Sequence, residues 1–242
     1  MSYTLRTFGG LALAGGLAGD GVGAARRKPL ALLVLLAGAG ELGMTRDKLA
    51  SYLWPEGETE KVRGVLKQTL YTIRQDFGEE LIVGSQDLHL NRTEVDVDLW
   101  TFEKAVGDGR PQDAVETYRG PFLDGFHLAD APGFERWVEA QRVRLARRFA
   151  AQIELLALAA MGRNQPMVAV DWWLRLTEQD PLDVRAISGL LHACLAAGDR
   201  PNAIRYAERH MTLLRRELEI TPDPEIRRLV EQARARPIPP AG

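Results

Sequence analysis

The stretch TEKVRGVLKQTLYTIRQDFG, residues 59–78, decides the fold of the first part of the chain. Two side-chain patterns run through it at helical spacing, so it predicts an amphipathic helix. Gly78 stands where a glycine commonly ends a helix. The face that we expect to pack against a core is apolar and consists of Val62, Leu66, Ile73 and Phe77, widened by Val65 and Leu70.

The opposite face of this helix carries three cations and a phenol, Arg63, Lys67, Tyr71 and Arg74. Steps of four, four and three residues bring these side chains to one exposed side. Such a side suits contacts with DNA phosphates and base edges, and the neighbouring Gln68 could pair with adenine through two hydrogen bonds. The alternative is an ordinary solvated helix face that binds nothing.

Length and composition predict a soluble protein of two domains. The chain has 242 residues, of which 45% are hydrophobic and 26% are charged. Its net charge of −2 excludes a generally basic nucleic-acid coat, so any DNA affinity must come from local clustering. Residues 60–75 show such a cluster, with four basic side chains and one acidic side chain.

Several features that the sequence lacks limit the possible cellular location of the chain and its possible catalytic or metal sites. One cysteine, Cys194, cannot form an internal disulfide, and no apolar run is long enough to cross a membrane. With no secretion signal at the amino terminus, we expect a cytoplasmic protein without a membrane association. The scattered histidines and the missing nucleophile motifs predict neither an enzyme, nor a metal site, nor a cofactor.

Residues 3–97 predict a winged helix-turn-helix preceded by a small sheet. Short apolar pieces at 3–8 and 11–13, separated by glycines, indicate an antiparallel sheet. A buried helix should follow from about residue 26 to 39, and a second should begin after the cap Thr45 and stop before Pro55. After the helix at 59–77, the pieces at 81–83 and 88–90 have the lengths of a β-hairpin. The third helix would enter the major groove, with the hairpin as the wing.

Cations outside the third helix are further candidates for DNA contacts. They lie before the first helix, at the start of the second helix, and on or beside the hairpin: Arg26, Arg27 and Lys28; Arg46 and Lys48; His89 and Arg92. Exposed loops explain their positions equally well.

Beyond Val97 the pattern is helical throughout. Helices are expected at 99–106, 111–118, 132–161, 167–178, 182–197, 202–218 and 224–234. Ala169 and Ala203 are equivalent positions of a repeat with the period of tetratricopeptide-like helix pairs, although a generic bundle remains an alternative. Asp96 and Asp98 form the closest pair of carboxylates in the sequence. We interpret them as the exposed side of a strand end or as a helix cap. We therefore expect an α+β DNA-binding domain at 1–97, an all-α domain at 98–236 and a linker or tail at 237–242.

Taken together, the two halves resemble the Streptomyces antibiotic regulatory protein family of bacterial transcription activators. The motifs that carry the resemblance are RRKPLALL at 26–33, TRDKL at 45–49, LWP at 53–55, the 63–78 frame, VDVDLWTF at 95–102, YRGPFL at 118–123 and LRRELEITPDP at 214–224. The third helix departs from the family at Gly64, Thr72 and Gln75, where members commonly carry asparagine, glutamine or arginine.

The resemblance implies an OmpR-type winged helix joined to a bacterial transcriptional activator domain. It also implies a homodimer that binds double-stranded DNA at promoter direct repeats and recruits RNA polymerase. In related winged helices the loop before the third helix approaches the polymerase, which makes Glu56 and Glu58 candidates for that contact. The competing interpretation is a protein-interaction scaffold whose degenerate winged helix does not bind DNA.

Overall fold

The structure is a computed structural model that describes residues 3–15, 27–219, 221 and 223–235. Arg26 and the predicted tail at 237–242 lie outside these residues. The chain separates into two compact units, residues 1–149 and residues 150–242, which are described one at a time. The division between the two compact units falls within helix α6 (Pro132–Gly162). It is a different boundary from the one predicted between the DNA-binding domain and the all-α domain at 97/98, which stays a prediction.

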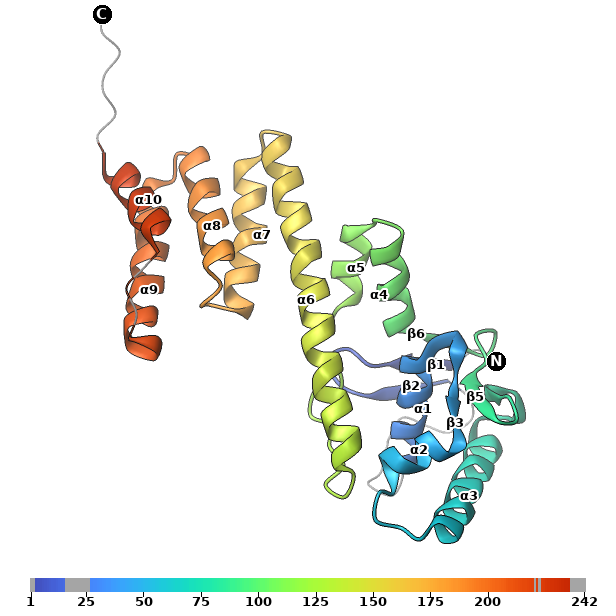
Figure 1. The fold of residues 1–242 in the computed structure, drawn as a ribbon. Coiled ribbons are helices and arrows are strands. Elements are labelled where there is room, and N and C mark those ends of the chain that lie inside the picture. The colour runs from blue at the N-terminus through green and yellow to red at the C-terminus, as the bar shows by residue number, and fades with distance from the viewer. Residues whose placement is uncertain (1–2, 16–26, 220, 222, 236–242) are drawn as a thin grey trace, which may run out of the picture. The chain divides into compact units, whose positions relative to one another are not determined.

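The first unit begins with the expected sequence of a sheet, three helices and a hairpin (Figure 1). In chain order its elements are β1 (Tyr3–Arg6), β2 (Ala12–Ala14), α1 (Arg27–Ala39), the 3-10 turn η2 (Gly40–Leu42), β3 (Met44–Thr45), α2 (Arg46–Leu53), α3 (Thr59–Phe77), the 3-10 turn η3 (Glu79–Leu81), β4 (Ile82–Val83), β5 (Asp87–Leu90), β6 (Val95–Val97), α4 (Asp98–Gly107), α5 (Pro111–Thr117) and the first part of α6.

Two small sheets flank the helices of this unit. In the first sheet, of order β2-β1-β6, β1 and β2 are antiparallel as predicted, and β6 adds to β1 in parallel. In the second, of order β3-β5-β4, the predicted hairpin is confirmed by the pairs Ile82–Leu90 and Val83–His89. Strand β3 was not expected, because a two-residue strand is too short to show an alternating pattern. Strand β6 agrees with the interpretation of Asp96 as the exposed side of a strand end.

Helix α1 is the buried centre of the first unit. All eight residues from Leu30 to Ala37 are buried, in agreement with the nearly all-apolar sequence. Helices α2, α3 and α4 and strand β5 pack against α1. The Nε1 of Trp100 in α4 donates to the carbonyl of Ala37, at 2.8 Å, and so ties the next helix to the end of α1.

Asp98 connects the amino-terminal sheet to helix α4: of its two predicted positions, the exposed strand end is wrong and the start of a helix agrees with the structure. The half-buried carboxylate accepts hydrogen bonds from the backbone N–H of Thr7 at 2.9 Å, from the Thr7 hydroxyl at 2.6 Å and from the N–H of Phe8 at 3.0 Å. It also accepts from the N–H of Leu99 at 2.8 Å, which makes it part of the helix start. Its neighbour Asp96 does lie on the exposed side of β6, as predicted.

The first part of α6 packs against α1 and α2. A Cβ added at Gly38 of α1 would lie 2.6 Å from the Trp137 ring of α6, so only glycine allows this approach. The Trp137 ring also lies 6.5 Å from the ring of Tyr52 in α2, between centroids. The helices of the predicted carboxyl-terminal domain therefore begin inside the first unit.

The second unit is a row of antiparallel helices (Figure 1). The end of α6 is followed by α7 (Pro166–Gln179), α8 (Val184–Ala196), α9 (Arg200–Leu218) and α10 (Pro224–Arg234), and Asp183, Asp199 and Asp223 cap the last three helices. Ala169 and Ala203 of the predicted repeat are buried. Within the described part of the chain, no helix is both long and apolar enough to cross a membrane.

Candidate nucleic-acid interface

Helix α3 presents one face to the core of the first unit and the other to solvent. Val62, Leu66, Leu70 and Ile73 are buried, which confirms most of the predicted apolar stripe. Val65 does not widen it, since 45% of its surface is exposed. The reason is geometric: Val65 directly precedes Leu66, which lies in the middle of the buried stripe, so its side chain lies about 100° around the helix from that of Leu66, at the margin of the stripe.

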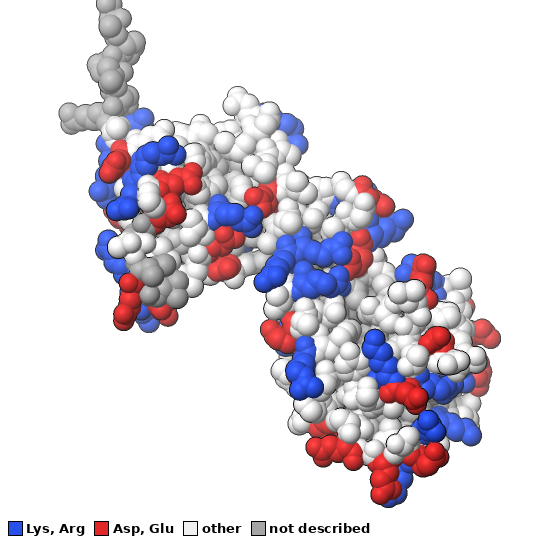
Figure 2. Space-filling model, in the orientation of Figure 1, with Lys and Arg blue, Asp and Glu red and all other residues white. Residues whose placement is uncertain are grey.

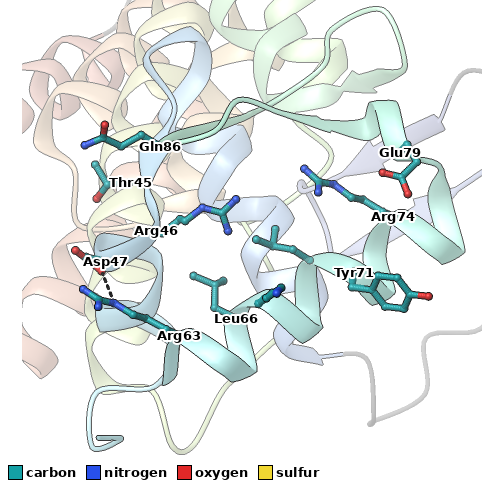
Figure 3. A pocket seen from close by; sticks show the side chains of 11 residues that line it. Thr45, Arg46, Asp47, Arg63, Leu66, Tyr71, Arg74, Glu79 and Gln86 are labelled. Carbon is teal, nitrogen blue, oxygen red and sulfur yellow. Dashed lines mark ion pairs between the residues drawn. The ribbon is translucent and has the colours of Figure 1, made fainter. Parts of the chain in front are cut away.

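The exposed face of α3, the start of α2 and the turn of the β4–β5 hairpin enclose a groove of about 760 Å³ (Figure 3). We call this the α3 groove. Four of the five side chains of this helix that were predicted to contact DNA belong to the wall of the groove, together with residues of the other elements. The wall consists of Thr45, Arg46, Asp47, Arg63, Leu66, Lys67, Leu70, Tyr71, Arg74, Glu79 and Gln86. Gln68 is exposed on α3 but does not line the groove.

The cations of the groove are neutralised to different degrees. Arg63 lies 3.7 Å from a carboxylate oxygen of Asp47 and 3.3 Å from one of Glu60. Lys67 is exposed and, within the described ranges, forms no ion pair. Figure 2 shows basic and acidic side chains interleaved on the visible surface around α3. Lys67 is therefore the wall cation that is most available to an incoming anion.

Arg46 and Arg74 have a second task, because each is bonded to the hairpin. The Nε of Arg46 donates to the carbonyl of Ser85 at 3.0 Å, and an Nη of Arg74 donates to that of Ile82 at 3.4 Å. Both side chains are half-buried, and their guanidinium groups point toward one another across the groove in Figure 3. The two arginines hold the hairpin to α2 and α3.

Two of the predicted cations, Arg27 and Lys28, lie in the first turn of α1 and contact protein rather than the groove. Arg27 donates to the carbonyl of His127 at 2.9 Å and lies over the ring of Phe126. Lys28 forms an ion pair of 2.6 Å with Asp130 and lies over the ring of Trp54. The hydrogen bond from Lys28 lowers the pKa of the Asp130 carboxyl below its ordinary value. Contacts between parts of the first unit thus account for the positions of both cations.

The remaining candidates lie outside the groove wall. Lys48 is exposed on α2, and His89 is half-buried in β5. Arg92 pairs with Glu41 at 3.2 Å and lies over the ring of Trp100. Glu56 is exposed in the loop before α3. Glu58 is exposed there too, and pairs with Lys61 at 2.8 Å.

Four polar residues of the groove wall were not predicted as site residues: Thr45 and Asp47, which were considered only at the start of the second helix, and Glu79 and Gln86. Glu79 follows the end of α3, and Gln86 lies in the hairpin turn; neither belongs to a periodic pattern. The predicted turn between the two hairpin strands was the only available signal for Gln86. That signal does not show that the turn faces α2, because this position arises only when the chain folds. No group of three or more potential metal ligands occurs within the ranges that the structure describes.

Comparison with known proteins identifies a family for the part of the chain that follows the α3 groove. Residues 97–234, more than half of the chain, match the family described as the bacterial transcriptional activator domain. The chain belongs to this family. Members of the bacterial transcriptional activator domain family are transcription regulators and not enzymes, which confirms the prediction that the chain is not an enzyme.

A solved structure of Mycobacterium tuberculosis EmbR, in complex with a low-affinity phosphopeptide, has a similar fold. Its TM-score is 0.65 at 20% identity, over 96% of this chain and 64% of that chain. This chain of the bacterial transcriptional activator domain family thus spans less than two thirds of the EmbR structure. Comparison with curated proteins finds no significant match.

Proposed function

We propose that the chain is a sequence-specific DNA-binding transcription regulator. In this proposal residues 3–97 act as an OmpR-type winged helix-turn-helix: α2 supports α3, α3 enters the major groove, and the β4–β5 hairpin is the wing. The observation that carries the proposal is the α3 groove, where an exposed helix face with Lys67, Arg63 and Tyr71 stands beside a hairpin. Membership in a transcriptional activator family supports the same role.

The proposed contacts differ in kind. Lys67 and Lys48, both exposed, bind phosphates as point charges. Gln68 and Tyr71, exposed on α3, are the candidates for base edges, because an amide can pair bidentately with adenine. Arg63 exchanges its carboxylate partners Asp47 and Glu60 for phosphate.

Arg46 and Arg74 combine two roles in the proposal. Each donates one N–H to a hairpin carbonyl and has further N–H groups for a phosphate, because a guanidinium carries five. They set the position of the wing as well as adding charge. Arg27, Lys28 and Arg92 have partners within the first unit, so the proposal does not depend on them.

The family and the resemblance support a wider role that is also proposed. The chain would bind promoter direct repeats as a homodimer in the cytoplasm and recruit RNA polymerase. The exposed loop with Glu56 and Glu58 would approach the polymerase.

Duplex binding at different salt concentrations tests the proposal. Fluorescence anisotropy with a labelled duplex between 50 and 200 mM salt should show binding that weakens steeply, because phosphate contacts release counterions. The variant Lys67→Ala should weaken binding and reduce the slope of log K against log salt by about 0.9, the value for one phosphate. The matched control is Lys104→Ala, since Lys104 is exposed in α4 and pairs with Asp108.

The outcomes separate the alternatives. An unchanged slope for Lys67→Ala would remove this side chain from the phosphate contacts. Failure of the wild-type protein to bind duplex DNA even at low salt would overturn the proposal and favour the protein-interaction scaffold.

A further inference from the structure

Within the first unit, helix α6 presents an exposed stripe of basic and apolar side chains, which we call the α6 face. Its exposed members are Arg136, Glu139, Ala140, Val143, Arg144 and Arg147. Steps of three and four residues place Arg136, Ala140, Val143 and Arg147 along one side of the helix. Figure 2 shows basic side chains gathered over the middle of α6. The α6 face is separate from the α3 groove, because the two surfaces share no residue.

The arginines of the α6 face are neutralised unequally. Arg144 lies 2.7 Å from one carboxylate oxygen of Glu103 in α4, and the half-buried Arg148, at the end of the face, pairs with the other oxygen. Among the residues that the structure describes, Arg136 and Arg147 have no carboxylate within ion-pair distance. These two guanidinium groups are therefore the available cations of the face.

The one carboxylate of the α6 face does not compensate the available cations. Glu139 pairs with Arg142, at 3.6 Å. Arg142 is held in place, because it also donates to the carbonyls of Phe122 and Leu123, both at 2.8 Å. The carboxylate is thus directed toward an arginine at the margin of the face, and the two available cations keep their charge.

Between the two available cations the α6 face is apolar. Val143 is 43% exposed, although valine is usually buried, and Ala140 beside it is exposed too. Arg136 and Arg147 follow one helical turn beyond this centre on either side, so the stripe covers roughly 16 Å of helix. Its complement is a surface with apolar groups in the middle and anions toward both ends. A phosphate backbone would supply the anions but leave Val143 without an apolar partner.

We propose that the α6 face binds an acidic amphipathic helix of another protein. Carboxylates of that helix pair with Arg136 and Arg147, and its apolar residues cover Val143 and Ala140. A helix of about three turns is long enough, because the stripe covers roughly 16 Å. An amphipathic helix is commonly recognised in this way, through apolar anchors on one face. The interaction goes beyond DNA recognition and does not depend on it, since the α3 groove takes no part.

Fluorescence anisotropy with labelled synthetic peptides tests the proposal on the full chain. The probe is a helix of about four turns that carries leucines in the middle of one face and glutamates toward both ends of that face. One control peptide has serines in place of the leucines, and another has glutamines in place of the glutamates. Each control should bind at least about 3-fold more weakly than the probe. Added salt should weaken binding of the probe, because it screens exposed ion pairs.

Matched variants of the chain locate the contact. The double variant Arg136→Ala/Arg147→Ala should weaken binding of the probe about 2- to 10-fold, since each exposed ion pair contributes little. Val143→Ser should weaken it about 3- to 10-fold, because part of a valine side chain is buried on binding. The controls are Arg119→Ala, at an exposed arginine of the first unit, and Val168→Ser, at a valine of α7 that is 42% exposed. Both controls should leave binding unchanged.

Several results would overturn the proposal. No binding of the probe, or equal binding of the serine peptide, would show that the face does not select an amphipathic helix. Duplex binding that depends on Arg136 and Arg147, with peptide binding independent of them, would assign the face to DNA. Self-association that Val143→Ser abolishes, without binding of the probe, would make the face an interface between copies of the chain.

Discussion

Replacing Asp98 should destabilise the first unit more than any other single carboxylate change that we consider. Asp98→Ala removes the acceptor of the N–H groups of Thr7, Phe8 and Leu99 and of the Thr7 hydroxyl. Thr7 is fully buried and Phe8 nearly so, so water cannot replace the carboxylate without a rearrangement.

The expected magnitude follows from these donors. Each buried donor left without an acceptor costs about 1–3 kcal/mol. The N–H of Leu99 is at the start of α4, where an N–H can be hydrated, and the Thr7 hydroxyl can rotate. The N–H groups of Thr7 and Phe8 are the two buried backbone donors, and together they should make Asp98→Ala lower the free energy of unfolding of the first unit by about 2–6 kcal/mol. Asp98→Asn retains one acceptor oxygen and should cost about 1–2 kcal/mol.

Urea unfolding combined with hydrogen exchange measured by mass spectrometry can test this. Exchange localises the loss, which should appear in β1 and at the start of α4 and be absent from α8 and α9. The control is Asp124→Ala, whose exposed carboxylate has no hydrogen bond in the described part of the chain. If Asp98→Ala costs no more than this control, the carboxylate does not hold the sheet to α4.

Two further substitutions and the reactivity of one native side chain have defined outcomes. Gly38→Ala should cost about 1–3 kcal/mol in urea unfolding, because its Cβ would lie 2.6 Å from the Trp137 ring; a neutral effect would show that the ring moves freely. Lys28→Ala should raise the pKa of Asp130 toward its ordinary value in an NMR titration and leave duplex affinity unchanged, whereas weaker DNA binding would indicate a phosphate contact. Burial raises the pKa of the Cys194 thiol from 9.0 to about 11, so native protein at pH 8 should react slowly with a thiol reagent. Because the folded pKa is the higher one, this contribution to stability should be complete below pH 9 and lost as the pH rises toward 11.

Much of the fold could be predicted from periodicity. The burial of Leu30 to Ala37, the cap at Thr45 and the hairpin at 82–90 all follow from local patterns, and the structure agrees. The parallel addition of β6 to β1 could not be predicted, because it joins residues about 90 positions apart through strands of only three and four residues. Val65 was misjudged since apolar character alone does not decide which way a helix turns a side chain.

The candidate site was predictable only in part. Helical spacing brought Arg63, Lys67, Tyr71 and Arg74 to one face, and the structure places all four in the α3 groove. Spacing could not reveal that Arg74 also bonds to the hairpin, because that partner comes from another element.

By itself, the order of apolar and polar residues determined the helices, their buried sides and the cluster of cations on α3, since these depend on neighbours within a few turns. Tertiary structure alone decided how those cations are used. A side chain binds whichever partner folding brings within reach: Lys28 meets Asp130, Arg46 meets the hairpin, and Lys67 remains exposed. Local sequence contains the charges, and only long-range packing determines which of them are neutralised.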